Sequence, residues 1–219
     1  MCGRFAIISP ADELREAFAL LEAGPYEPRY NAAPTQLLPV IPNRGERRLE
    51  LFRWGLIPHW SRDPGIGAKL INARAETLTE KPSFRQAFAR QRCLVPANGF
   101  YEWKRSGRTK QPYFIRTRAK APFAFAGLWD CWRGPDTGPL CSFTIVTCAP
   151  GPELAQIHDR MPVILPPEAY ATWLAAGPQP ADELQALLVP FAGEELEVFP
   201  VSTAVNSPRS EGPELIRPI

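Results

Sequence analysis

The chain has 219 residues, of which 45% are hydrophobic and 22% are charged, as in a globular protein that buries a sizeable core. No apolar run approaches the roughly 18 residues that span a bilayer, and the N-terminal residues lack the basic leader, apolar stretch and cleavage site of a signal peptide. The formal net charge of +2 is the sum of a basic central block and acidic flanks. We expect a cytoplasmic protein without a membrane partner, nucleoid-associated if it is bacterial.

Periodic patterns predict short strands and short helices along the chain. A strand is expected over residues 3–8, then a helix with Ser9 as its N-cap and an apolar stripe of Leu14, Phe18 and Leu21. Residues 24–35 are expected to be loop. Further strands are expected over residues 37–41, 49–54, 93–95, 100–104, 112–116, 123–132, 141–147 and 196–201, and further helices over 82–90, 167–176 and 181–188. Turns are expected at residues 43–45 and, as a hairpin, at 106–107.

Many short strands joined by hairpins, with a few helices between them, are typical of an α+β protein. We expect a single domain over residues 1–219, with a curved antiparallel sheet or barrel-like core and peripheral helices. Because alternating strand–helix–strand units are absent, a doubly wound dinucleotide-binding fold is not expected.

Charge is distributed unevenly along the chain. Residues 44–133 contain 19 Lys/Arg and 7 Asp/Glu, whereas residues 134–219 contain 3 and 11. Of the 25 basic residues 20 are arginine, a side chain that suits bidentate contacts with phosphate. The pattern fits a surface that binds a polyanion, but it also fits two oppositely charged regions that pack on each other. Charge alone leaves both interpretations open.

The five cysteines do not indicate a disulfide framework or a metal site. They are Cys2, Cys93, Cys131, Cys141 and Cys148, an odd number without a Cys-x-x-Cys pair. Cys141 and Cys148 are seven residues apart and would point to opposite faces of a strand. We therefore expect the last four to be buried structural thiols, and we expect no metal and no cofactor.

Cys2 is a candidate nucleophile because a small second residue permits removal of Met1. The mature chain would then begin with an amine and a thiol on one residue. An α-amine has a pKa far below that of lysine, so part of it is neutral near pH 7 and can condense with an aldehyde. The neighbouring thiol can then close a five-membered thiazolidine ring. A cysteine at position two is weak evidence when it stands alone.

Two further motifs carry candidate polar groups within strand-like segments. Asn72, Arg74 and Glu76 alternate with small residues and would share one face of an extended segment, where Arg74 could meet a phosphate. The alternative is a solvent-facing edge. Glu102 lies between two aromatic residues, and a carboxyl group in an apolar pocket has a raised pKa that suits acid–base chemistry. The alternative is an outward-facing strand residue.

A histidine and a tryptophan complete the candidates that come from the residues themselves. His158 lies in a polar cluster before Pro162, where it could donate a proton or make a structural hydrogen bond. Trp60 lies inside the basic block, and exposed aromatic residues among cations are typical of proteins that bind single-stranded nucleic acid. Core packing is the competing explanation for such aromatic residues, and we favour it for Trp54.

Taken together, these segments resemble the SOS-response-associated peptidase family, whose members shield abasic sites by covalent attachment. Each segment is weakly informative alone, but their joint occurrence in this order is specific. The segments that carry the resemblance are residues 1–5, 29–34, 54–58, 72–77, 99–103, 125–129, 157–162 and 200–202.

The resemblance implies a set of site residues. Cys2 would be the nucleophile, and Asn72, Glu102 and His158 fall on the family's active-site positions. Arg74 and Arg160 match its phosphate contacts, and Asn31 and Pro34 match a loop near the site. The full set of expected DNA contacts is Arg4, Asn31, Pro34, Trp60, Arg74, Arg85, Trp103 and Arg160.

The resemblance also implies an activity. A monomer would bind single-stranded DNA that contains an abasic site, including at junctions with a duplex. His158 would assist opening of the sugar, the Cys2 amine would attack, Glu102 would move protons, and the thiol would close the ring. An associated abasic-site lyase or peptidase activity stays open. The alternatives are a self-processing N-terminal-nucleophile cysteine peptidase and a non-covalent reader of single-stranded DNA.

Overall fold

The computed structural model describes residues 2–22, 24, 26–107, 109–134 and 138–219. Its core is a closed barrel of five strands, in which the order β10-β4-β3-β6-β9 returns to β10. These strands are β3 (Leu37–Pro42), β4 (Glu50–Trp54), β6 (Arg92–Ala97), β9 (Phe123–Trp132) and β10 (Leu140–Cys148). Three short strands extend the barrel sheet: β5 (Asn72–Arg74) and β11 (Met161–Pro162) pair with β10, and β12 (Ile164–Leu165) pairs with β9.

One pairing in the barrel is parallel, which the expected antiparallel core did not include. β4 and β10 run in the same direction, while the other neighbours around the ring are antiparallel. The reason is geometric: strand direction cannot alternate all the way around a closed ring with an odd number of strands. β5 continues the parallel pairing beyond β4 and places Asn72 opposite Ile145 of β10.

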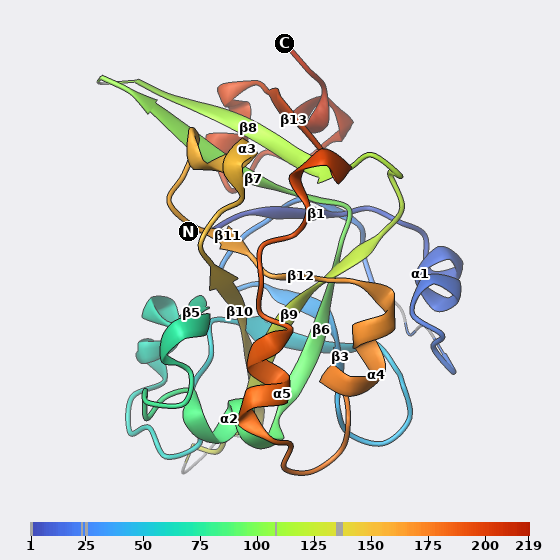
Figure 1. Ribbon diagram of the computed structural model, residues 1–219, viewed down its shortest axis with the longest axis vertical. Helices are drawn as coiled ribbons and strands as arrows, with labels where there is room; N and C mark the ends of the chain where they lie inside the picture. Colours follow the sequence, from blue (N-terminus) through green and yellow to red (C-terminus); the bar gives the residue numbers. More distant parts are fainter. Residues whose placement is uncertain (1, 23, 25, 108, 135–137) are drawn as a thin grey trace.

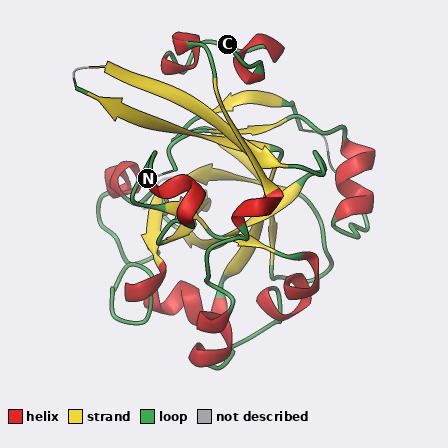
Figure 2. Ribbon diagram, turned by 45° about the horizontal axis from the view of Figure 1, so that its top comes forward, coloured by secondary structure: helices red, strands yellow, loops and turns green. Residues whose placement is uncertain are grey.

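A second sheet of five antiparallel strands lies against the barrel. Its order is β13 (Leu196–Pro200), β8 (Thr109–Thr117), β7 (Gly99–Ser106), β1 (Phe5–Ile7) and β2 (Arg29–Ala32). β7 and β8 form a hairpin that projects beyond the body of the molecule (Figure 2). The expected turn is confirmed at Gly107, which has a φ of 59° that glycine adopts easily.

Strand alternation gives this second sheet two buried faces. Phe100 of β7 belongs to the main core shared with the barrel, whereas Tyr101 belongs to a smaller core with Val201, Val205 and Leu215 of the C-terminal segment. Successive side chains of a strand point to opposite faces. Glu102, which follows Tyr101, therefore points to the barrel side.

Short helices lie around the strands, as Figure 1 shows, and the expected α+β class with a barrel core and peripheral helices is confirmed. The α-helices are α1 (Ala11–Ala17), α2 (Arg85–Arg90), α3 (Pro152–Ala155), α4 (Tyr170–Trp173) and α5 (Ala181–Ala186). The 3-10 turns are η1 (Pro64–Lys69), η2 (Ala75–Thr77), η3 (Pro167–Ala169), η4 (Gly193–Glu195), η5 (Thr203–Asn206) and η6 (Pro213–Ile216). Across the described ranges, no helix has the length and apolar character needed to cross a membrane.

Several local expectations near the N-terminus need correction. Ser9 does not cap α1, because Pro10 occupies the N-cap position and the Ser9 hydroxyl instead accepts a hydrogen bond from the Asn98 side chain at 2.7 Å. The apolar stripe of α1 ends at Phe18, since Leu21 is 58% exposed. The segment expected to be loop contains β2, which pairs with β1.

The cysteine expectation was wrong for one pair. Cys131 of β9 and Cys141 of β10 are direct cross-strand partners and form a disulfide. Directly opposed residues of an antiparallel pair bring their side chains together, so the register of these strands creates a pairing that cysteine spacing does not reveal. Cys93 and Cys148 are buried free thiols, as expected.

Candidate functional site

The four predicted catalytic residues meet where the two sheets face each other. Asn72 on β5 donates from Nδ2 to the backbone carbonyl of Cys2 at 2.8 Å. Glu102 on β7 has its Oε2 3.9 Å from Nε2 of His158, which lies in the turn between α3 and β11. The Glu102 carboxylate also acts electrostatically on the Cys2 thiol. Three segments far apart in the sequence thus converge near the one that carries Cys2. Figure 1 shows β5, β11 and the start of β1 on one side of the molecule.

The Cys2 side chain is fully buried just ahead of β1. Its Sγ lies 3.8 Å from the carbonyl oxygen of Arg4. Burial raises the pKa of the thiol well above its usual range, and the negative charge of Glu102 raises it further. The thiol is therefore protonated at neutral pH, so chemistry that begins at the Cys2 sulfur would first need a base.

Glu102 is the buried carboxyl group that the sequence pattern suggested. It is only 3% exposed, because β7 directs it to the buried face of the second sheet that lies toward the barrel. Burial raises its pKa to about 7. Near neutral pH this group is divided between its acid and its base form, which suits it to move protons in either direction.

His158 presents its two ring nitrogens to different partners. Nδ1 accepts a hydrogen bond from the backbone N–H of Arg160 at 3.0 Å and lies 2.9 Å from Oδ1 of Asp159. Nε2 faces Glu102. Partial burial lowers the pKa of the imidazole, so its neutral form predominates at neutral pH.

Asn72 has an unused acceptor at the site. While its Nδ2 holds the Cys2 carbonyl, its Oδ1 is buried and has no hydrogen-bond partner among the described residues. A buried amide oxygen without a partner is unfavourable, so this atom is well placed to accept a hydrogen bond from a substrate hydroxyl or an amine.

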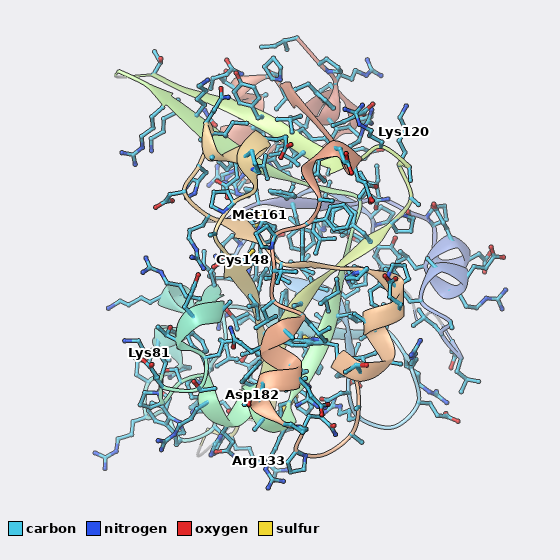
Figure 3. The ribbon with its side chains drawn as sticks, in the orientation of Figure 1. Lys81, Lys120, Arg133, Cys148, Met161 and Asp182 are labelled. Atoms are coloured by element: carbon cyan, nitrogen blue, oxygen red, sulfur yellow. A yellow bond between two sulfur atoms is a disulfide. The ribbon has the colours of Figure 1, made fainter. Side chains whose placement is uncertain are left out.

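Two hollows of about 370 Å³ each flank the four residues. One is lined by Leu70, Asn72, Arg74, Thr77, Lys81, Pro82, Ser83 and Phe84. The other is lined by Trp103, Arg105, Gln156, Ile157, His158 and Asp159. Each therefore contains a predicted catalytic side chain together with at least one cation, Arg74 and Lys81 in the first and Arg105 in the second. Lys81 and Arg105 were not among the predicted site residues, and only their place in the basic block marked them. In Figure 3, Lys81 is labelled at the left of the molecule, with Cys148, the last residue of β10, above it and nearer the centre.

Several predicted DNA contacts are accessible. Arg74 on β5 and Arg85 at the start of α2 are exposed, and Trp60, ahead of η1, is 52% exposed. Trp103 is half-buried, with its indole N–H donating to the Asn206 side chain at 2.7 Å. Pro34 is half-buried in the turn between β2 and β3.

Asn31 is not accessible, which corrects its assignment as a DNA contact. Its side chain is fully buried, with Nδ2 within hydrogen-bond distance of the carbonyls of Val205, Ser207 and Ser210 and Oδ1 accepting from Arg4 at 2.8 Å. Arg4 also donates to the Val205 carbonyl at 2.8 Å. Both side chains hold the C-terminal segment against the second sheet.

Arg160 is likewise engaged within the protein. Its guanidinium forms a bidentate ion pair with Glu76, at 2.6 and 2.9 Å, and its side chain is only 13% exposed. The sequence pattern placed Glu76 on one extended face with Asn72 and Arg74, but β5 ends at Arg74 and η2 turns Glu76 toward Arg160. The ion pair joins two motifs that are separated by 84 residues.

The basic block is only partly a free cationic surface. Arg92 is fully buried and donates to the carbonyls of Trp173, Phe88 and Ala175, among others. Arg116 pairs with Glu197 of the acidic C-terminal region at 2.8 Å. Some cations of the block are therefore engaged by backbone carbonyls or by the acidic C-terminal region, whereas Arg74 and Lys81 line the hollow beside Asn72. In the described ranges, no three His, Cys, Asp or Glu side chains are grouped to hold a metal ion.

Comparison with known proteins agrees with this arrangement. The family model described as "SOS response associated peptidase (SRAP)" matches residues 1–208. The chain is 47% identical to the abasic site processing protein YoqW of Bacillus subtilis, over 99% of both chains. It is 34% identical to the abasic site processing protein HMCES of Xenopus tropicalis, over 100% of this chain and 78% of that one.

Solved structures show the same fold. A protein from Bacteroides thetaiotaomicron superposes with a TM-score of 0.91 at 27% identity and full coverage of both chains. A protein from Bordetella bronchiseptica superposes with a TM-score of 0.81 at 29% identity, over 92% of this chain and 100% of that one. The match to the family model and the full-length similarity to YoqW show that this chain belongs to the SOS response associated peptidase family.

Proposed function

We propose that this protein binds single-stranded DNA and captures abasic sites covalently through Cys2 after Met1 has been removed. The observation that carries the proposal is the convergence of Asn72, Glu102 and His158 on Cys2 between two hollows that contain cations. The names of the relatives YoqW and HMCES, abasic site processing proteins, support the choice of substrate.

The capture joins two functional groups of Cys2 to one carbon. The ring-opened deoxyribose carries an aldehyde, and the α-amine of Cys2 adds to its carbon to form a carbinolamine. Loss of water gives the Schiff base. The thiol then adds its sulfur to the same carbon and its proton is taken up at nitrogen, which closes the thiazolidine. The sequence of steps needs no oxidant and no cofactor.

The surrounding side chains suit the proton transfers in this scheme. Glu102, with its pKa raised to about 7 by burial, can take the proton that the amine releases and return it to the departing water. His158 faces Glu102 and can assist opening of the sugar. Oδ1 of Asn72 is placed to accept a hydrogen bond from the amine or from a sugar hydroxyl.

The docking of DNA rests on the exposed cations and on Trp60. Arg74 and Lys81 line the hollow that contains Asn72, where they can hold the phosphates that flank the lesion. Arg85 is exposed on α2. The indole of Trp60 is 52% exposed and can stack on a base where a duplex ends, which allows binding at single-strand/double-strand junctions.

The test is a denaturing gel. The protein, with mass spectrometry confirming that Cys2 is the first residue, is incubated with single-stranded DNA that contains one abasic site. A band that survives denaturation and is absent with intact DNA is expected. A protein with a free Cys2 amine that gives no such band would overturn the proposal.

The description of the family as a peptidase supports one alternative, a cysteine peptidase with Cys2 as its N-terminal nucleophile. The buried and protonated thiol of Cys2 disfavours attack by sulfur on a protein substrate. Removal of Met1 is the only processing that covalent capture requires. Cleavage of unrelated proteins in trans, lost in Cys2→Ala, would favour the peptidase instead.

A further inference from the structure

The Glu76–Arg160 ion pair fixes the turn that carries His158. Besides its two bonds to Glu76, Arg160 donates from Nη2 to the backbone carbonyl of Thr147 on β10 at 2.5 Å. Its side chain is 13% exposed, so it is held from two sides with little solvent around it. Residues 158–160 are thereby attached to both η2 and the barrel.

The backbone of Arg160 in turn favours one tautomer of the His158 ring. Its N–H donates to Nδ1 at 3.0 Å. In a neutral imidazole, the nitrogen that accepts a hydrogen bond has no proton, so this bond favours the tautomer with the proton on Nε2. Nε2 is the nitrogen that faces Oε2 of Glu102 at 3.9 Å. This tautomer can offer a proton toward the buried carboxyl group.

Asp159 competes for the same ring nitrogen. Its Oδ1 lies 2.9 Å from Nδ1, and because a carboxylate can only accept, it favours the opposite tautomer with the proton on Nδ1. That tautomer would turn a lone pair of Nε2 toward Glu102. The Asp159 side chain is 88% exposed, and solvent and salt therefore weaken its electrostatic interaction with Nδ1 of His158. Arg105 lines the same hollow as His158 and Asp159, so a positive charge also lies near these two side chains.

We infer that Glu76 is a positioning residue for the capture reaction: by holding Arg160, it keeps the Arg160 N–H on Nδ1 of His158 and directs the Nε2 proton toward Glu102. The inference rests on the proposed function for the reaction that it serves, but the tautomer of His158 can be measured independently of any reaction. Glu76→Gln keeps the size of the side chain and removes the charge that binds both Arg160 nitrogens. The turn is then free to shift, and Asp159 can take over Nδ1.

Imidazole nitrogen NMR tests the tautomer directly. The chain has two histidines, and His59→Gln identifies the signals of each. His59 is an internal reference, because its Nδ1 lies 2.9 Å from Oδ2 of Asp130 and is expected to carry the proton. We expect His158 to be protonated on Nε2 in the wild type and to gain the Nδ1–H form in Glu76→Gln, with His59 unchanged. An Nε2–H tautomer that persists in Glu76→Gln would overturn the inference, as would an Nδ1–H tautomer of His158 in the wild type.

Crosslinking kinetics supply the second readout, with Glu80→Gln as the matched control. Glu80 is exposed in the same segment, and its side chain makes no hydrogen bond or ion pair with the described residues. Because a general acid or base contributes about 10²–10⁴-fold, a mispositioned His158 should slow single-turnover adduct formation about tenfold in Glu76→Gln. Affinity for intact single strands should not fall, since a negative charge is removed.

Glu76→Asp, which keeps the charge, should recover part of the rate. Equal rates for Glu76→Gln and Glu80→Gln would show that Glu76 acts only through its charge and would overturn the inference. If the wild type forms no adduct at all, the proposed function fails, while the NMR result still decides whether Glu76 sets the tautomer of His158.

Discussion

The side chain of Asn72 is hydrogen-bonded to the backbone of Cys2, with Nδ2 of the amide donating to the carbonyl oxygen at 2.8 Å. This bond connects β5, which is paired with barrel strand β10, to the residues that lead into β1 of the other sheet. Because the second polar atom of the amide is buried without a described partner, the same residue can both place Cys2 and bind substrate.

Asn72→Ala is therefore expected to slow capture while leaving DNA binding largely intact. The Cys2 carbonyl loses its donor, and the attacking group loses its fixed orientation; misplacement of this kind costs about 10²-fold in rate. Single-turnover crosslinking gives the rate, and binding of intact single strands gives the affinity. A variant that reacts at the wild-type rate would exclude Asn72 from the site.

Glu102→Gln should change stability in a pH-dependent way. Burial raises the pKa of Glu102 in the folded protein to about 7, above its ordinary value of 4.5. The folded state therefore binds this proton more tightly than the unfolded state does, and the carboxyl group destabilises the fold progressively as pH rises from about 4.5 to about 7. Thermal melts should show Glu102→Gln to be more stable than the wild type at pH 8, with the difference vanishing at pH 4. A constant difference across this range would contradict the assigned burial effect.

The same variant should react slowly. Glutamine keeps the shape of the side chain but cannot carry a proton between the amine and the departing water, so adduct formation should fall about 10²–10⁴-fold. The rate of adduct formation should fall less in His158→Ala if His158 assists only the opening of the sugar. Wild-type rates in both variants would show that neither side chain moves protons in the reaction.

Arg74→Ala should weaken binding of intact and abasic single strands alike. Arg74 is exposed and lines the hollow beside Asn72. Loss of one phosphate contact should flatten the dependence of log K on log salt by about 0.7. Arg15→Ala is the matched control, because Arg15 is an exposed arginine on α1, on the other side of the molecule from β5 (Figure 1). Equal effects of the two substitutions would point to net charge rather than a contact at the site.

Asn31→Ala tests whether Asn31 supports the fold rather than DNA. Its buried amide holds the C-terminal segment, so its removal deletes the hydrogen bonds to the carbonyls of Ser207 and Ser210 and should lower the free energy of unfolding by about 1–3 kcal/mol. Urea denaturation measures this, and DNA affinity at low temperature should change little. A stable variant with weakened DNA binding would restore Asn31 as a DNA contact.

Local patterns were sufficient to predict most strands and to single out Asn72, Glu102 and His158 as candidates, but the assignment of these residues to one site came from the family resemblance. The strand expected over residues 123–132 has the bounds of β9, and the aromatic neighbours of Glu102 indicated a buried carboxyl group. Both signals come from side chains within a few residues of each other, and strand periodicity determines which face they share.

Features that depend on distant segments could not be predicted in this way. The hydrogen bond from the Asn31 side chain to the Ser207 carbonyl joins residues that are 176 positions apart. The disulfide of Cys131 with Cys141 depends on the register of two strands. The same holds for Glu76, whose partner Arg160 lies in another motif. Each motif was visible in the sequence, but which charges face DNA and which face each other is decided by packing.

The last prediction separates the two functional groups of Cys2. In the proposed scheme the amine makes the first bond and the thiol makes the second, so their loss should have different consequences. Cys2→Ala keeps an α-amine once Met1 is removed, because alanine is also small. That variant should form a reversible Schiff base that a hydride reductant traps, without a stable thiazolidine.

A blocked amine should abolish both products, because the first bond can no longer form. Retention of Met1, or an N-terminal tag confirmed by mass spectrometry, provides this second variant. The buried thiol of Cys2, with its pKa raised above the usual range, supports this order, because a protonated sulfur is a weaker first nucleophile than a neutral amine. An adduct that survives denaturation in Cys2→Ala without reductant, or in the blocked chain, would place the nucleophile elsewhere, with Lys69 or another thiol as the next candidates.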